Sequence, residues 1–274
     1  MLSGDKVIGL YCIVDDMLKE MHHYEDKRVR VSDSEVITTA FVAVLYFGGH
    51  PDNARHFMQL QGYVPLMVDK SRCCRRLHRL SDFLLALFYT LGQQLRDMAG
   101  AATCRLDSFA VAVCDNIRIS RSKILQGELF RGEHASMRRF FYGVRVQVLT
   151  LSGIPVEFCM VPGAEHDSQS LGKLPFDVAP ESIIYMDAGY TDYLSEDDLF
   201  EAEGIVAKVQ RKSNSKRKDE PDVRFLKEYM RKAIEGDFSQ IQAKMLRSIH
   251  AVTKEDFLLK VALFVIAFAF CKIA

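Results

Sequence analysis

The spacing of apolar residues changes near Gly100, and this change constrains the fold more than any other feature of the chain. Before it, residues 5–23 carry apolar side chains at helical spacing, and a Ser-x-x-Glu capping box precedes the apolar run 36–47. After it, residues 142–149 alternate as a strand does, and residues 154–161 return as a partner strand beyond a Ser-Gly turn. The sequence therefore predicts an all-helical region followed by a mixed α/β region.

The expected boundary between these two regions lies at residue 100. Residues 1–100 are predicted to form an all-α N-terminal region, and residues 101–274 an α/β domain. Short strands that alternate with helices in the second region favour a mixed β-sheet flanked by helices. A polar, basic loop is expected at about residues 210–222.

Composition excludes several classes of protein. The 36 basic and 36 acidic residues give no net charge, so the whole chain neither requires nor excludes a polyanionic partner. Seven cysteines without C-x-x-C spacing argue against a disulfide framework or a zinc ribbon. No secretory signal is visible, and the apolar run 261–271 is about half the roughly 20 residues of a membrane span. We expect a cytoplasmic protein with no membrane partner and a buried helix at 261–271.

One carboxylate, Asp107, stands inside the expected strand 104–113. A buried, ionised carboxylate costs several kcal/mol unless it is paired, hydrogen-bonded or bound to a cation. Two further acids stand out by context, because Asp187 follows the short apolar strand 182–186 and Glu235 lies on a long expected helix. Hard oxygen ligands suit Mg²⁺ or Mn²⁺, and two such ions can flank the attacking and leaving oxygens at phosphorus. A cluster of these acids would serve metal-assisted phosphoryl transfer.

The two later acids also have structural interpretations. An Asp at the tip of a strand is often a turn or N-cap residue, and nearby Asp192 could take the functional role instead. Glu235 lies about 100° from the buried face of its helix, where a pair with Arg231 would be an ordinary surface feature. Asp237 is a competitor. The spacing of the acids alone supports only a nuclease-like hypothesis.

Two basic segments flank the acids in the sequence. Residues 118–145 hold seven Lys or Arg against two acids, and residues 208–232 hold ten against four. A carboxylate centre with positive loops around it suits a phosphodiester substrate. Solvated loops would explain either segment taken singly.

A third basic group lies in the helical region. One expected helix after Ser71 carries four arginines, Arg72, Arg75, Arg76 and Arg79. This pattern is similar to a recognition helix that contacts phosphates or enters a major groove. A solvated basic face on a packing helix explains the pattern equally well.

An ordered series of short motifs runs through the chain. It begins with Asp107-Ser108-Phe109 and continues through residues 114–121, 141–143, 153–158, 166–167, 185–192, 214–217, 231–235, 238–241 and 249–253. The helical region contributes residues 32–37 and 76–80. Together these motifs resemble bacterial insertion-sequence transposases of the DDE type.

The resemblance implies an RNase H-like catalytic domain whose three acids are Asp107, Asp187 and Glu235. Related transposases carry a tyrosine, arginine, glutamate and lysine signature around the third acid. Arg231 stands at the expected R-x-x-x-E spacing. The outer positions depart from the signature, because Glu228 replaces the tyrosine and a glutamine replaces the lysine.

The resemblance also implies an activity, that of a metal-dependent DNA transposase that is both endonuclease and polynucleotidyl transferase. Two Mg²⁺ or Mn²⁺ ions held by the three acids would activate water and expose a 3′-hydroxyl, which then attacks target DNA. The partners would be double-stranded terminal inverted repeats and target DNA, bound by a homodimer at the nucleoid of a bacterium. Two alternatives are a remnant DNA-binding protein that does not cut, and a hydrolytic nuclease without strand transfer.

Several positions are expected to contact DNA. Arg118, Arg121 and Lys123 are candidates for phosphate contacts near the active site, and Arg231 would orient Glu235 or a phosphate. Residues 1–100 would bind the element ends. His166 could assist proton transfer, or it could be a structural imidazole after a Pro-Gly turn.

Overall fold

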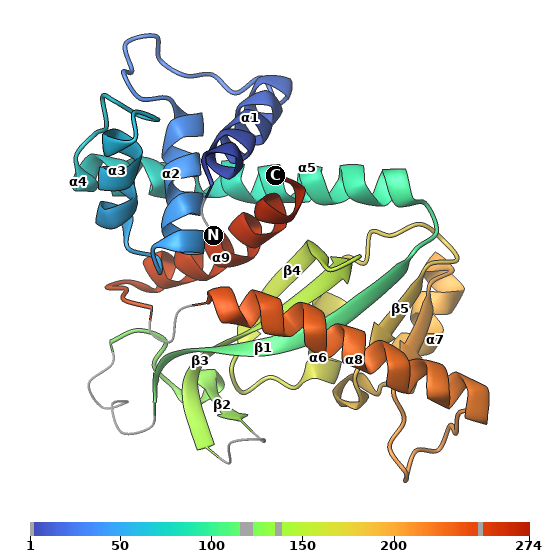
Figure 1. Cartoon of the computed structure of the whole chain (residues 1–274). Coiled ribbons are helices and arrows are strands. Elements are labelled where there is room, and N and C mark those ends of the chain that lie inside the picture. Colours follow the sequence, from blue (N-terminus) through green and yellow to red (C-terminus); the bar gives the residue numbers. More distant parts are fainter. Residues whose placement is uncertain (1–2, 116–122, 135–138, 246–248) are drawn as a thin grey trace. The chain divides into compact units, whose positions relative to one another are not determined.

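A computed structural model describes residues 3–115, 123–134, 139–245 and 249–274 (Figure 1). The chain divides into two compact units, a helical unit of residues 1–90 with 243–274 and a sheet unit of residues 91–242. Two helices, α5 (Ser81–Ala99) and α8 (Pro221–Lys244), contribute residues to both units.

The helical unit is built from amphipathic and buried helices. Besides part of α5 it contains α1 (Gly4–Glu20), α2 (Asp33–Tyr46), α3 (Pro51–Leu60), α4 (Lys70–Arg79) and α9 (Lys254–Ile273). The capping box at the start of α2 is confirmed, because Glu35 N donates to Ser32 Oγ and Ser32 N donates to Glu35 Oε2. No helix in the described ranges is long and apolar enough to span a membrane.

Helix α9 is the buried helix expected at the end of the sequence. Residues 261–270 are all buried, and the Phe270 ring lies 5.2 Å from the ring of Phe41 in α2. Because this apolar surface packs within the helical unit, residues 243–274 belong with the N-terminal region. The sequence-based boundary, which kept 101–274 together, differs from the structure at this point.

The sheet unit contains one mixed β-sheet. In the described part of the chain its strands are β1 (Thr103–Asp115), β2 (Arg131–His134), β3 (Arg139–Leu151), β4 (Ile154–Pro162), β5 (Ile183–Met186) and β6 (Val206–Val209). The order β4-β3-β1-β5-β6 has antiparallel pairing from β4 to β1 and parallel pairing from β1 to β6. Strand β2 pairs with the first residues of β3. The mixed α/β fold expected from the sequence is confirmed.

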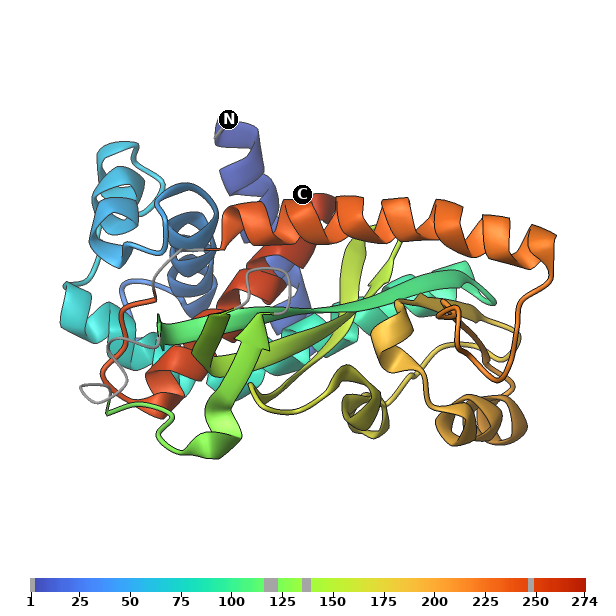
Figure 2. The same ribbon diagram turned by 90° about the horizontal axis from the view of Figure 1, so that it is seen from below.

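Helices cover both faces of this sheet. Helix α8 lies on one face, and α6 (Asp167–Ser170) and α7 (Tyr193–Glu203) lie on the other (Figure 2). Apolar side chains of alternate β1 positions, including Leu106, enter a core on the α6 and α7 side. Buried Ile234, Phe238 and Ile241 of α8 cover the opposite face. The other alternate positions of β1, which do not enter the core on the α6 and α7 side, are therefore directed toward α8.

Candidate active site

Asp107 is positioned by the alternation of side chains along β1. Its neighbours at i±2 contact α8, because Arg105 pairs with Asp237 and the Phe109 ring lies 6.4 Å from the Phe238 ring. The side chain of Asp107 shares this face, since side chains two apart on a strand point the same way. The adjacent Ser108 N–H donates to Asp107 Oδ1 at 2.7 Å, which helps to fix the carboxylate.

Asp187 is brought beside Asp107 by the register of two parallel strands. Leu106 of β1 pairs with Met186 of β5, so the two acids are the next residues on neighbouring strands. Asp187 occupies the N-cap position of the short 3₁₀ helix 188–190, but its side chain makes no capping hydrogen bond. Helix capping therefore does not explain why a carboxylate stands at this position.

Glu235 is supplied by α8, at the edge of the helix face that buries Ile234 and Phe238. Its Oε1 lies 3.0 Å from Nε of Arg231, one turn earlier, and its side chain is 63% exposed. The expected Arg231–Glu235 pair is confirmed. A pair this exposed contributes little to stability, so the glutamate can exchange partners at low cost.

The three acids line one cavity of about 140 Å³ in the sheet unit. Its wall also contains three cationic side chains, Lys208, Lys227 and Arg231. A small cavity lined by both carboxylates and cationic side chains can hold a cation together with a phosphate group. This arrangement requires residues from β1, β5, β6 and α8.

The pKa of Asp107 is raised from 3.8 to about 7, chiefly because the carboxyl group is buried. The carboxylates of Asp187, Asp167 and Glu235 contribute to this rise, while the Ser108 N–H acts in the opposite direction. A carboxyl group with a pKa near neutrality loses its proton readily when a cation arrives. The electrostatic cost noted for Asp107 from the sequence is therefore present in the folded chain.

The donor chemistry of the site fits a hard divalent cation, because carboxylate oxygens are the ligands that Mg²⁺ and Mn²⁺ prefer. Within the described ranges, no group of three or more His, Cys, Asp or Glu side chains is close enough to hold a metal ion. The pairing of Glu235 with Arg231 gives a physical reason, since the third carboxylate is held by a cation of its own helix.

Comparison with known proteins decides the family. The sequence model of the transposase DDE domain family matches residues 99–252, which are 154 of the 274 residues. The chain belongs to this family. The matched range contains Asp107, Asp187 and Glu235, and the sequence-based identification as a DDE-type transposase is confirmed.

Similarity to solved structures is weak. A cryo-EM structure of the piggyBac transposase synaptic complex with hairpin DNA aligns at 11% identity with a TM-score of 0.34. The alignment covers 79% of this chain and 50% of that one, so the chain spans about half the length of that protein. No curated protein matches the chain.

A fourth acid of the DDE domain, Asp167, supports the site from the α6 side of the sheet. Its Oδ1 accepts hydrogen bonds from Ser108 Oγ at 2.7 Å and from Gln147 Nε2 at 3.0 Å. Tyr190 O–H in turn donates to Gln147 Oε1. A Cβ at Gly189 would lie 3.2 Å from Asp167 Oδ2, so the glycine permits this close approach.

This buried network joins the residue after Asp107 to the segment after Asp187. The sequence reasoning placed Asp167 in a motif but gave it no role, and considered only the neighbouring His166 for chemistry. His166 is exposed and does not line the cavity. The sequence feature that could have indicated this network is Gln147, a polar residue in the middle of an apolar strand. Its side chain is fully buried.

Two lysines at the cavity were also missed by the sequence reasoning. Lys227 is only 6% exposed, and its Nζ donates to the Val209 carbonyl and to Asp219. Lys208 Nζ lies 5.7 Å from the centre of the Tyr185 ring. The basic count of residues 208–232 included both lysines, but a count cannot tell which side chains face the acids.

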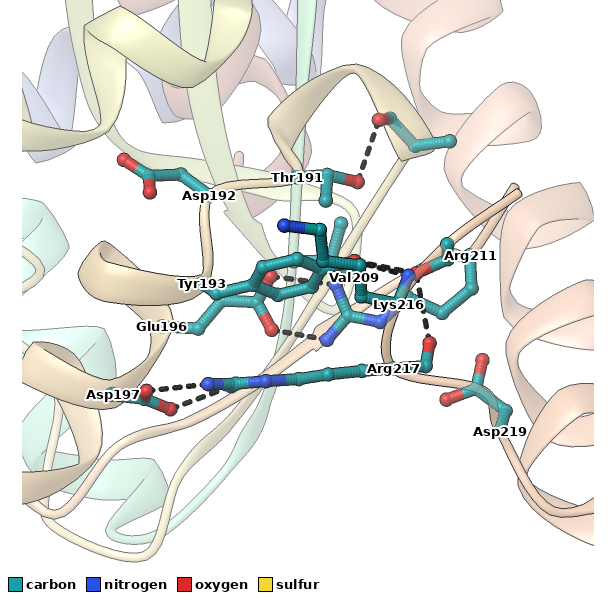
Figure 3. A network of polar contacts seen from close by, with 12 residues as sticks. Thr191, Asp192, Tyr193, Glu196, Asp197, Val209, Arg211, Lys216, Arg217 and Asp219 are labelled. Atoms are coloured by element: carbon teal, nitrogen blue, oxygen red, sulfur yellow. Dashed lines mark hydrogen bonds and ion pairs between the residues drawn. The ribbon is translucent and has the colours of Figure 1, made fainter. Parts of the chain in front are cut away.

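The basic loop between β6 and α8 is fastened to α7 by a polar network (Figure 3). Arg211 forms two hydrogen bonds with Glu196, and Arg217 forms two with Asp197. The two guanidinium carbons lie 5.2 Å and 4.7 Å from the centre of the Tyr193 ring. Two of the positive charges of this loop are therefore paired with acidic side chains of α7.

The competing acids have structural partners. Asp192 caps α7, where its carboxylate accepts hydrogen bonds from Leu194 N and Ser195 Oγ. Asp237 pairs with Arg105. Neither acid lines the cavity, so the cavity favours Asp187 and Glu235 over these alternatives.

The residues expected to contact DNA have different surroundings. Arg118 and Arg121 lie outside the described residues, whereas Lys123 is exposed and Arg231 lines the cavity. The four arginines expected in a recognition helix lie on α4 of the helical unit. Of these, Arg76 is held by Glu25, Asp33 and the Val31 carbonyl, so its charge is already paired.

Proposed function

We propose that this DDE-family protein cuts the ends of an insertion element and joins them to target DNA. The observation that carries the proposal is the single cavity lined by Asp107, Asp187 and Glu235 within the range that matches the family. In the first step water attacks a phosphorus atom and the bond to the 3′-oxygen breaks, leaving a 3′-hydroxyl and a 5′-phosphate. In the second, that hydroxyl attacks a target phosphodiester and displaces its 3′-oxygen.

Asp107, Asp187 and Glu235 would hold the metal, two Mg²⁺ or Mn²⁺ ions in our proposal. When bound, these ions supply charge neutralisation at phosphorus and a more acidic water molecule. The carboxylate chemistry of the three acids supports this assignment, as does the raised pKa of Asp107, which reflects burial first and the neighbouring carboxylates second.

The remaining residues would position the substrate. Arg231 can bind a phosphate oxygen once Glu235 turns toward the cations, since a guanidinium binds carboxylate or phosphate with the same fork of N–H groups. Lys208, which lines the same cavity, would offset the charge of the scissile phosphate. The Ser108 N–H holds Asp107 in place through its 2.7 Å hydrogen bond.

Binding of DNA outside the cavity would use the remaining basic side chains. We assign phosphate contacts to Arg118, Arg121 and Lys123 near the active site, and element-end binding to the N-terminal helical region. A homodimer on paired ends would let two copies act on one element. The proposed setting is the bacterial cytoplasm.

The test uses the full chain and labelled linear duplexes that carry the DNA bracketing its gene, with and without Mg²⁺. The proposal predicts metal-dependent nicks with 3′-hydroxyl ends, followed by covalent donor–target products. Nicks that never give a joined product would replace the proposal with a hydrolytic nuclease. Binding without any nick would replace it with a remnant DNA-binding protein.

A further inference from the structure

A second basic site lies in the helical unit, in a groove of about 680 Å³. One wall is the segment before α2 and the other is α4 with the segment that precedes it. Six arginines line the groove, Arg28, Arg30, Arg72, Arg75, Arg76 and Arg79, against one acid, Asp69. The groove therefore concentrates positive charge on a chain whose net charge is zero.

The arginines of α4 form one row along the groove. Positions 72, 75, 76 and 79 are spaced i, i+3, i+4 and i+7, which puts them on one face of the helix. Seven residues of helix rise by about 10 Å, and the phosphates of one DNA strand recur about every 3.4 Å along the axis. The row is thus long enough to follow several phosphates of one strand.

Internal pairing divides these arginines into two groups. Arg28 pairs with Asp26, and Arg72 pairs with the N-cap residue Asp69. Arg75, by contrast, donates from Nε only to the Ser71 carbonyl. Arg30 and Arg79 are exposed as well, and among the described residues neither has a carboxylate partner. The unpaired positive charge of the groove therefore resides on Arg30, Arg75 and Arg79.

Arg76 has a different role at the same place. Its guanidinium donates to the Val31 carbonyl, to Glu25 and to Asp33, and its side chain is only 18% exposed. These bonds tie α4 to the segment that carries Arg28 and Arg30. Arg76 thereby fixes the separation of the two walls, so it holds the groove in shape and is not itself available to a ligand.

We infer that this groove binds the sugar–phosphate backbone of duplex DNA, an inference that takes its ligand from the proposed function. Exposed guanidinium groups bind phosphate oxygens in a bidentate manner, and a row of them reads the repeating backbone without regard to sequence. The groove therefore supplies affinity and register. Arg30, which lies outside the expected recognition helix, contacts DNA phosphates in the same way as Arg75 and Arg79.

The test measures binding of the full chain to a fluorescent 30-base-pair duplex of arbitrary sequence, in EDTA, over a range of KCl concentrations. The variant Arg30→Ala/Arg75→Ala/Arg79→Ala is compared with Lys19→Ala/Lys27→Ala/Lys70→Ala, which removes the same charge from residues of the helical unit that do not line the groove. The salt slope should fall by about 0.9 for each lost phosphate contact, up to roughly 2.7 in the arginine variant. The lysine control should keep the slope of the original chain.

Three results would overturn the inference. The first is an arginine variant with an unchanged slope and affinity, and the second is a lysine control that loses as much. The third is displacement of the duplex by polyglutamate of equal charge as readily as by unlabelled duplex, which would indicate a surface for an acidic protein. The triple Arg→Lys variant guards against a folding defect, because it should recover most of the slope. Since EDTA prevents metal-dependent cutting, a failure of cleavage leaves this measurement unaffected.

Discussion

Asp107 and Asp187 each directly follow one member of a paired position in two parallel strands, because Leu106 of β1 and Met186 of β5 are partners in the sheet. The sheet register alone therefore brings together two acids that are 80 positions apart (187 − 107). Helix α8 adds Glu235 to the same cavity. The predictions below test what this arrangement does.

Removal of the third acid should abolish strand cleavage. Glu235→Gln should lower the rate by several orders of magnitude, because a carboxylate at a catalytic metal contributes several kcal/mol of charge stabilisation. Helix α8 offers a matched control, since Glu228 pairs with Arg224 at 3.0 Å with the same i,i+4 spacing. Glu228→Gln should cleave normally in a gel assay on labelled duplex; equal loss in both variants would assign Glu235 a structural role only.

The stability of the metal-free protein should fall as pH rises from about 4 to 7. The pKa of Asp107 is raised from 3.8 to about 7, so the folded chain binds more protons than the unfolded chain in this window. Stability associated with the protonated group is complete below pH 4 and is lost as pH rises through 7. Urea unfolding in EDTA should show this slope, and Asp107→Asn should flatten it. An unchanged slope in the variant would show that Asp107 is not the group responsible.

Asp167 should matter to cleavage although it does not line the cavity. Asp167→Asn weakens the acceptor for Ser108 Oγ and Gln147 Nε2, and we expect a loss of roughly 10- to 100-fold, as for other outer-shell partners of metal ligands. The Mg²⁺ concentration for half-maximal cleavage should rise, which a purely structural role would not require. Glu165→Gln, which affects a pair with the half-exposed Lys173 outside the cavity, is the control. Normal Mg²⁺ dependence in Asp167→Asn would refute the positioning role.

The two ion pairs of the basic loop should differ in their contribution to stability. The side chains of Arg211 and Glu196 are 11% and 6% exposed, whereas those of Arg217 and Asp197 are both 47% exposed. Glu196→Ala leaves a buried guanidinium without its partner, which should cost about 3–5 kcal/mol of unfolding free energy. Asp197→Ala should cost about 0.2–1 kcal/mol. Denaturant unfolding monitored by circular dichroism measures both, and equal losses would contradict this account of the network.

Local patterns in the sequence predicted much of the fold. The hairpin of β3 and β4, the capping box of α2 and the apolar α9 each depend on neighbouring residues, and each is present. Asp107 attracted attention because a charge within an apolar strand is costly, a signal that is also local. These features could be inferred because spacing and residue type determine them.

Features that depend on distant partners could not be inferred in this way. The packing of α9 within the helical unit joins segments more than 200 residues apart, and no local pattern specifies it. The buried Lys227 depends on Asp219 and the Val209 carbonyl, and the internal pairing of Arg76 depends on Glu25 and Asp33. Counting basic residues located the charge but did not distinguish arginines that are paired internally from those that are available to DNA.

The central claim is that Asp107, Asp187 and Glu235 hold divalent metal together. Anomalous diffraction from crystals of the protein grown with Mn²⁺ tests it most directly. The account predicts manganese peaks in contact with the carboxylates of Asp107 and Asp187, with Glu235 turned from Arg231 to the metal. Manganese bound elsewhere, with Glu235 still paired to Arg231, would contradict it.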